Sequence, residues 1–277
     1  MSDVHAILAR MPRWAAMAVL MVIVLGPLYW VTISSLKSRE EILRTTPTLF
    51  PQSVTFDSFR QLFTATDYGT YLTNSFIVAL LTAAFTVLVA FLGAYGLYRL
   101  RVPGGDKIAG LVLLSYMIPG TLLLVPLYQV FAQLRIVNTH TALILVNVAF
   151  TAPFCTWLLR GFLQAIPKEI DEAAAVDGAG PLRTMFSVVL PLMAPGLATV
   201  AVYAFVYSWT EFVFASQLLV DDALKTLPIG LSAIMGQYTV NWGLLMAGTV
   251  CTMIPAIVPF LFVGKYFVGG LTAGAVK

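Results

Sequence analysis

The sequence predicts an all-α membrane protein with six transmembrane helices, and two observations support this fold class: few residues are charged, and the charges are widely spaced. Of 277 residues, 16 are Lys or Arg and 13 are Asp or Glu, so 10% are charged, against about 25% in a soluble domain. Apolar and aromatic residues make up 59% of the chain. This composition excludes an ordinary soluble enzyme and a disordered chain, and two cysteines cannot build a disulfide scaffold. The small net charge of +3 argues against a nucleic-acid partner.

Six long runs without a charged residue locate the spans. Each run exceeds the about 20 residues that a helix needs to cross the hydrocarbon core. The first follows Arg10 and Arg13 as a secretion signal would, but it is longer than the about 7–15 apolar residues of a signal peptide and lacks a small-residue cleavage site. It is therefore expected to stay as a span, and residues 1–277 are expected to form one transmembrane domain. We place the spans at 14–33, 73–98, 108–132, 141–162, 193–219 and 245–268.

The distribution of Lys and Arg predicts the orientation. With the N-terminus in the cytoplasm, the inner segments carry ten of these residues and the outer segments six, four of them in the long 34–70 loop. Cytoplasmic loops are enriched in Lys and Arg, and long loops are exported largely regardless of their charge. Both termini are therefore expected to be cytoplasmic.

Prolines within the spans indicate that these helices are more than anchors. An interior proline frees a backbone carbonyl that another group must satisfy, and kinked helices around a cavity are a usual setting. The alternative, that prolines are simply commoner in membrane helices than in soluble ones, stays open. The prolines concerned are Pro119, Pro126, Pro153, Pro195, Pro255 and Pro259.

No catalytic or metal-binding constellation can be assembled from the sequence. The histidines, His5 and His140, lie outside the predicted spans, and Cys155 and Cys251 lie in different spans. No phosphate-binding loop of the G-x-x-x-x-G-K-[ST] type occurs, so the chain cannot hydrolyse ATP by that route. An ion-coupled secondary carrier would be expected to show ionisable groups along its pathway and internal repeats. Glu211 is the only acidic residue that lies within a predicted span.

The long cytoplasmic loop 163–192 differs from the rest of the chain. It is expected to form two short helices around a glycine break, the first beginning at Pro167 and ending at Gly178, the second beginning at Pro181. Acidic residues follow Pro167, where the helix dipole favours them. The second helix carries an apolar stripe, which either packs back under the bundle or docks into a partner's groove. The stripe comprises Leu182, Met185, Phe186 and Val189.

Several motifs in this order resemble the permease subunits of bacterial ATP-binding-cassette importers, in their carbohydrate-uptake (MalG-like) branch. In the loop, the resemblance to the family's EAA motif is carried by Glu172, Ala173, Ala174, Asp177, Gly178 and Ala179, with Leu190-Pro191 following. Elsewhere it is carried by LFPQSVTFDSFRQLF (49–63), Asn74-Ser75, Trp209-Thr210-Glu211-Phe212 and YFVGGLTAGAVK (266–277). The likeness covers nearly the whole chain.

The resemblance implies a type I importer permease fold in the bacterial inner membrane and a non-catalytic role. The partners it implies are a second permease in a heterodimer, two ATPase subunits that bind ATP and magnesium, and an extracytoplasmic solute-binding protein, all within membrane lipid. Residues 168–179 would be the coupling helix that sits in the ATPase. The solutes of this family are sugars, polyols and glycerol-phosphate-type compounds.

A candidate solute pathway is predicted in the fifth span. Tyr203, Tyr207, Glu211 and Phe214 recur at helical spacing and would share one face, where aromatic rings and one acidic acceptor suit a polyhydroxylated solute. The alternative is that Glu211 is an interfacial charge that reaches the headgroups or a partner helix.

Overall fold

The computed structural model describes residues 2–100, 102–235 and 240–273, and in these ranges it contains helices and no β-strand. This confirms the predicted all-helical class. The chain forms two compact units, the first comprising residues 1–69 and 231–254 and the second residues 70–230 and 255–277. Three helices run from one unit into the other: α4 (Tyr68–Ala94), α13 (Leu227–Ile234) and α14 (Trp242–Ala273).

The first unit contains α1 (Ser2–Ser35), α2 (Arg39–Ile42) and α3 (Asp57–Thr64). Its 34–70 loop buries two charged side chains, Lys37 and Glu41. Thr48 donates a hydrogen bond from its hydroxyl to Glu41 (2.5 Å), and the backbone N–H of Gln52 donates to the same carboxylate (3.1 Å). The bond from Thr48, with help from Gln52, holds the pKa of Glu41 below its usual range. The loop is therefore a folded structure with its own polar core.

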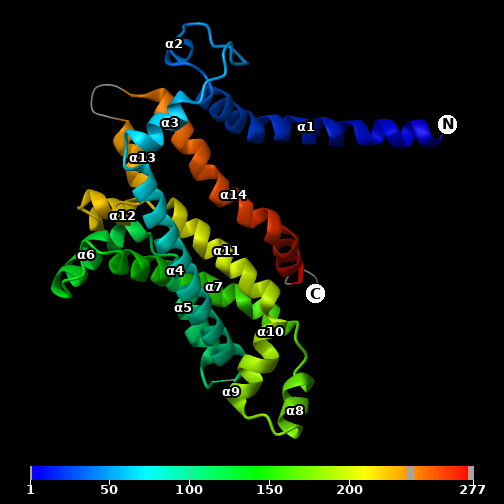
Figure 1. Ribbon diagram of the computed structural model, residues 1–277. Coiled ribbons are helices and arrows are strands. Elements are labelled where there is room, and N and C mark those ends of the chain that lie inside the picture. Colours follow the sequence, from blue (N-terminus) through cyan, green and yellow to red (C-terminus); the bar gives the residue numbers. More distant parts are fainter. Residues whose placement is uncertain (1, 101, 236–239, 274–277) are drawn as a thin grey trace. The chain divides into compact units, whose positions relative to one another are not determined.

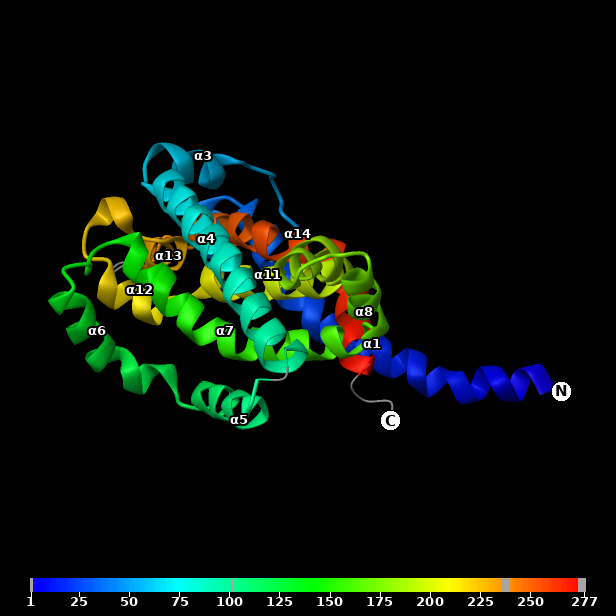
Figure 2. The ribbon, with the colours of Figure 1, turned by 90° about the horizontal axis from the view of Figure 1, so that it is seen from below.

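The second unit is a helical bundle with α7 at its centre, α5 on one side and α11 on the other (Figures 1 and 2). Two of its elements are π-helical (η1 and η3) and two are 3₁₀-helical (η2 and η4). In chain order, its further elements are η1 (Tyr95–Arg99), α5 (Gly105–Tyr116), η2 (Gly120–Leu123), α6 (Leu124–Gln133), α7 (His140–Gln164), α8 (Glu169–Val176), α9 (Pro181–Arg183), η3 (Thr184–Val189), α10 (Leu190–Leu192), α11 (Ala194–Thr210), α12 (Val213–Leu218) and η4 (Asp222–Leu224).

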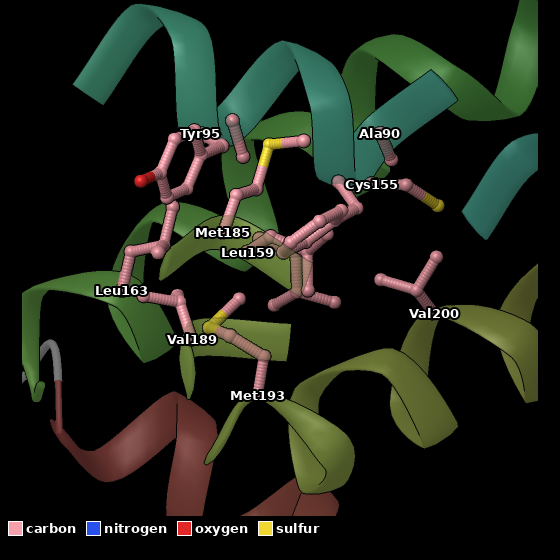
Figure 3. Close-up of a cluster of buried hydrophobic side chains, with 12 residues drawn as sticks. Ala90, Tyr95, Cys155, Leu159, Leu163, Met185, Val189, Met193 and Val200 are labelled. Carbon is pink, nitrogen blue, oxygen red and sulfur yellow. The ribbon is translucent and has the colours of Figure 1, made fainter. Parts of the chain in front are cut away.

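An apolar core joins α4, α7, η3 and the start of α11 (Figure 3). Phe91, Leu159, Val189 and Met193 are each exposed by at most 1%. The helices approach closely beside this core, because a Cβ placed on Gly196 of α11 would lie 2.6 Å from Cγ of Phe162 on α7. Dense packing of this kind is what holds membrane helices together, since lipid tails are as apolar as the side chains. The remaining members of the core are Ala90, Ala94, Tyr95, Cys155, Leu158, Leu163, Met185 and Val200.

A buried chain of polar side chains links the same three long helices nearer their middle. Thr86 and Thr151 are joined hydroxyl to hydroxyl at 2.8 Å, Asn147 donates to Ser208 at 2.9 Å, and Ser208 donates to Thr82 at 3.3 Å. All five side chains are at least nine-tenths buried. Such bonds between membrane helices contribute modestly, about 0.6 kcal/mol each on average, but they fix which faces meet.

Two of the predicted spans are not single straight helices. The span expected at 108–132 is broken between Tyr116 and Gly120, and the helices on either side meet at 88°. The break falls at Pro119-Gly120, where proline removes a backbone donor and glycine lacks a Cβ. The helix expected over 193–219 ends at Thr210, and a 76° bend separates it from Pro181–Leu192.

The described residues contain four helices long and apolar enough to cross a membrane, or up to six if each bent pair counts as one span. The observed bounds of those four helices contain the predicted spans at 14–33, 141–162 and 245–268 and most of the one at 73–98. A total of six spans stays a prediction. The last residues of the family-like C-terminal stretch, 274–277, lie outside the described part.

Candidate functional site

Helix α8 and the turn after it lie in the segment 168–179, which the family resemblance implies is a coupling helix. The backbone N–H of Gly178 donates to the carbonyl of Ala175 (3.0 Å), and that of Ala179 donates to Ala174 (2.9 Å). These two bonds, with Gly178 at φ +79°, form the Schellman motif that ends helices. The prediction that Gly178 ends the helix and that Pro181 begins the next is confirmed. The expected start at Pro167 is wrong: Lys168 is the N-cap, and the helix begins at Glu169.

The family-like residues of α8 do not share one environment. Ala174 is buried at 9% exposure, and it turns toward the bundle with half-buried Ile170. Glu172, Ala173 and Asp177 are exposed, as are the apolar side chains of Val176 (88%) and Leu182 (70%). Ala179 is half-buried and Gly178 exposed. The helix therefore packs through one face and presents a mixed acidic and apolar face outward, which is the composition of an interaction surface.

Arg99, at the end of η1, holds this helix in place. Its Nε lies 2.5 Å from Oδ2 of Asp171, while its two terminal nitrogens donate to the carbonyls of Ile166 (2.9 Å) and Pro167 (3.0 Å). The Arg99 side chain is 5% exposed and that of Asp171 27%. A guanidinium is the side chain that can satisfy three acceptors in one plane. Arg99 thus fixes α8 to the end of α4.

Sequence reasoning missed this contact. From the sequence, Arg99 is one of the positive charges that predict the orientation, and Asp171 is one of the acidic residues in the first turn of a helix. The two residues are 72 positions apart, and no periodic pattern connects them. Only the fold of the second unit brings them together.

The apolar stripe of the second loop helix is divided between the two alternatives. Met185 and Val189 are buried in the core, whereas Leu182 and Phe186 are exposed by 70% and 46%. The reason is that residues Thr184–Val189 form a π-helical turn, whose i→i+5 bonds change the angular spacing that the α-helical stripe assumed. Half of the stripe packs under the bundle, and half is displayed beside α8.

The predicted solute-facing residues do not lie on one continuous helix. Tyr203 and Tyr207 belong to α11, but the helix ends at Thr210 because Glu211 has an extended backbone (φ −68°, ψ 122°). The Glu211 carboxylate accepts hydrogen bonds from the N–H groups of Phe214 (2.7 Å) and Ala215 (2.8 Å), so it caps α12. Phe214 belongs to this second helix, α12, and is buried against Phe150. The expectation of one shared helical face is therefore wrong.

Around Tyr203, the fold assembles an aromatic cluster that the sequence did not indicate. The Tyr203 hydroxyl lies 3.1 Å from that of Tyr116 on α5, and its ring centroid lies 4.8 Å from that of Phe154 on α7. Tyr207 and Trp157 extend the row at centroid distances of 6.5 Å from Tyr203 and 6.1 Å from Phe154. Three helices contribute, so no single spacing in the sequence could have predicted the cluster.

The fold defines a class, a helical membrane protein with several apolar spans and a short helix exposed at one end of its bundle. Residues 91–272 match the family described as "Binding-protein-dependent transport system inner membrane component". The chain belongs to this family. It is therefore an inner-membrane permease component of a bacterial transport system that works with a binding protein, and it is neither an enzyme nor an ion-coupled carrier.

Named relatives support this assignment. The chain is 36% identical to the sulfoquinovosyl glycerol transport system permease protein SmoH of Agrobacterium fabrum, over 96% of this chain and 93% of that protein. It is 33% identical to the trehalose transport system permease protein SugB of Mycobacterium tuberculosis, over 97% and 98%. It is also 32% identical to the diacetylchitobiose uptake system permease protein DasC of Streptomyces coelicolor, over 91% of each chain.

Solved structures confirm the importer permease fold. A chain from a bacterial ABC transporter involved in the import of the acidic polysaccharide alginate superposes with a TM-score of 0.80 at 19% identity, covering 93% of this chain and 95% of that one. A chain from the alginate transporter in complex with its pentasaccharide-bound periplasmic protein gives a TM-score of 0.71 at 15% identity, covering 95% and 94%.

Proposed function

We propose that this chain is one of two permease subunits, forming a heterodimer, of an ATP-driven importer for a sugar or a related polyol or glycerol-phosphate solute. Two ATPase subunits hold the ATP and magnesium, and an extracytoplasmic binding protein delivers the solute. The named relatives, which handle sulfoquinovosyl glycerol, trehalose and diacetylchitobiose, support this solute class. Both termini and the 163–192 loop lie in the cytoplasm.

The observation that carries the proposal is the outward face of α8. Acidic Glu172 and Asp177 flank the exposed apolar side chain of Val176, a surface suited to a cleft in the ATPase. ATP binding draws the ATPases together and moves α8. Because Arg99 ties α8 to the end of α4, the displacement passes to the bundle and opens the pathway to the other side of the membrane. The aromatic cluster around Tyr203, with Tyr207 and Glu211 nearby, lines that pathway.

The orientation is tested by reporter fusions. A reporter fused at Asp177 is expected to read cytoplasmic and one at Asp222 extracytoplasmic, because the charge bias puts the two loops on opposite sides. The same location for both fusions would contradict the proposed topology.

The coupling role is tested by charge reversal. Glu172→Lys places an unpaired cation in a packed interface, at a cost of about 2–5 kcal/mol, so the ATPase is expected to be lost on purification or to stop responding to the loaded binding protein. The matched control is Asp222→Lys at the other end of the bundle, whose side chain is 76% exposed and which should leave ATPase co-purification unchanged. Full uptake by the Glu172→Lys transporter would place the ATPase contact elsewhere.

A further inference from the structure

A large cavity with a basic lining opens at the loop end of the second unit. Its volume is about 790 Å³, and it lies among the end of η1, the start of α5, the last turns of α7 and the segment that enters α8. Among the described residues, the lining contains four cations, Arg99, Lys107, Arg160 and Lys168, and no carboxylate. Of these four cations, Arg99 makes the contacts with α8 described above, and the other three have no role in them.

The other three cations, Lys107, Arg160 and Lys168, take no part in the contacts by which Arg99 holds α8. Within the described part of the chain, the recorded ion pairs are Arg99 with Asp171 and Lys225 with Asp222, so Lys107, Arg160 and Lys168 are outside them. Arg160 is oriented by Tyr98, because its Cζ lies 5.0 Å from the centroid of that ring. A cavity lined by several cations attracts an anion.

An apolar groove continues from the basic cavity. It has a volume of about 360 Å³ and shares Tyr98 and Arg160 with the cavity. From there it runs along α5 and α7, past Gly110, Leu113 and Trp157. Within this lining, the indole of Trp157 is exposed by 42%. The ligand that fits both parts has an anionic head and an apolar tail.

We propose that the cavity and the groove bind one anionic phospholipid of the surrounding membrane, with its phosphate among Lys107, Arg160 and Lys168 and an acyl chain along Leu113 and Trp157. The position agrees with this occupant, since the cavity lies where α5 begins and α7 ends, the level at which headgroups meet membrane helices. Its volume lies in the range of sites for whole organic ligands, well beyond what a free phosphate ion fills. The proposal does not depend on which solute is transported.

Trp157 provides a direct reporter for the experiment. The complete transporter is reconstituted in phosphatidylcholine vesicles that contain a minor fraction of phosphatidylglycerol brominated on its acyl chains, which quenches tryptophan on contact. The difference between the wild type and Trp157→Phe isolates the signal of Trp157. Brominated phosphatidylglycerol is expected to quench this signal more than an equal fraction of brominated phosphatidylcholine.

Two variants test the two halves of the site. Lys107→Gln with Lys168→Gln should lower the preference for phosphatidylglycerol by about fivefold for each cation removed. Gly110→Leu should reduce quenching by both lipids, because it fills the groove from a position where a Cβ meets no atom within 4 Å. Lys225→Gln, which removes a cation at the other end of the bundle, is the control and should change nothing.

Four results would overturn the proposal. Equal quenching by the two lipids would remove the charge selectivity, and an unchanged preference in the double variant would place the selectivity elsewhere. Loss of the preference on addition of inorganic phosphate would assign the cavity to a soluble anion. No quenching of Trp157 by either lipid would mean that a protein partner covers the groove.

Discussion

The two ends of the second unit are held together in different ways. At the loop end, the charged side chain of Arg99 makes three polar contacts, with the carbonyls of Ile166 and Pro167 before α8 and with Asp171 within it. The face that α8 turns outward is exposed, including Val176 at 88%. At this end, α8 packs through one face, is tied by the Arg99 side chain and exposes its other face.

The opposite end is fastened by many neutral hydrogen bonds to backbone atoms. Asn74 donates to the carbonyls of Ala223 (2.8 Å) and Lys225 (2.9 Å), and Ser75 accepts from the N–H of Leu227 (2.7 Å). Asn138 accepts from the N–H groups of Val220 (2.9 Å) and Asp221 (3.0 Å). The ion pair between Lys225 and Asp222 at this end is peripheral, because the Asp222 side chain is 76% exposed. The hydrogen bond that Lys225 donates to Asp222 raises the pKa of the Lys225 ammonium above its usual range.

Because the two ends are held by different contacts, we expect them to have different roles in the transport cycle. Neutral bonds spread over several loops resist movement in any direction, so this end is expected to stay rigid through the transport cycle. A single guanidinium that binds three acceptors gives the loop end one defined position from which force can be passed to α4. Substitutions at the two ends should therefore affect different properties, coupling at one and stability at the other.

The largest effect is expected from Arg99→Met. This change leaves Asp171 and two carbonyls without a partner, at a cost of about 2–3 kcal/mol because Asp171 is partly exposed. Uptake and ATPase stimulation by the loaded binding protein should fall at least tenfold, with normal amounts of the chain in the membrane. Arg99→Lys should fail nearly as badly, because an ammonium cannot reproduce the planar set of contacts.

The control for this pair is Lys225→Met. It breaks the peripheral ion pair with Asp222, whose worth is below about 1 kcal/mol. If Arg99→Met transports normally, the anchor has no part in coupling, and the contrast between the ends fails.

A smaller effect, on stability alone, is expected from Asn138. Its backbone has a φ of +60°, which asparagine tolerates better than most residues. Asn138→Gly keeps this conformation but loses both acceptor bonds, so it should lower the free energy of unfolding by about 1–2 kcal/mol. Asn138→Ala should cost about 1 kcal/mol more through backbone strain.

Thermal unfolding of the purified transporter measures both Asn138 variants. ATPase coupling should remain normal at temperatures where the protein is folded. Loss of coupling in a variant that melts like the wild type would show that this end also takes part in the motion.

The smallest effect is expected from Gly178→Ala. A Cβ at this position meets no atom within 4 Å, so the penalty is backbone strain of about 1 kcal/mol at φ +79°. Coupling should decrease a few-fold in ATPase assays. Gly180→Ala is the matched control, because Gly180 has the ordinary φ of −69° and equally open surroundings. Equal effects of the two changes would show that strain is not the cause.

The sequence allowed the helical class and the break of the coupling loop to be predicted, since both depend on local properties. Gly178 and Pro181 punctuate the chain through their own backbone preferences, and the structure follows them. Glu211 shows what helical spacing in the sequence cannot predict. Its position at helical spacing from Tyr207 predicted a shared face, but the carboxylate accepts two backbone N–H bonds and ends the helix instead. Side-chain competition for backbone donors is invisible to periodicity.

Contacts between segments far apart in the chain could not be predicted from the sequence either. The Arg99–Asp171 pair and the cluster of Tyr116, Phe154 and Tyr203 each join residues separated by dozens of positions. Each residue alone is unremarkable in type and spacing. Only the way that α5, α7 and α11 pack makes them neighbours.

The buried polar chain of Thr82, Thr86, Asn147, Thr151 and Ser208 has a consequence for biosynthesis. Helices enter the membrane in the order of their synthesis, and N-terminal parts form first. Thr86 on α4 can meet Thr151 as soon as α7 has been inserted, but the Asn147 amide group bonded to Ser208 must wait for α11, about 60 residues later. Until then, Asn147 and Thr82 face lipid or other lipid-embedded chains with their hydrogen-bonding groups unused. Ser208 therefore completes this polar chain, and a chain that stalls before α11 is expected to leave Asn147 and Thr82 without the partner that Ser208 provides.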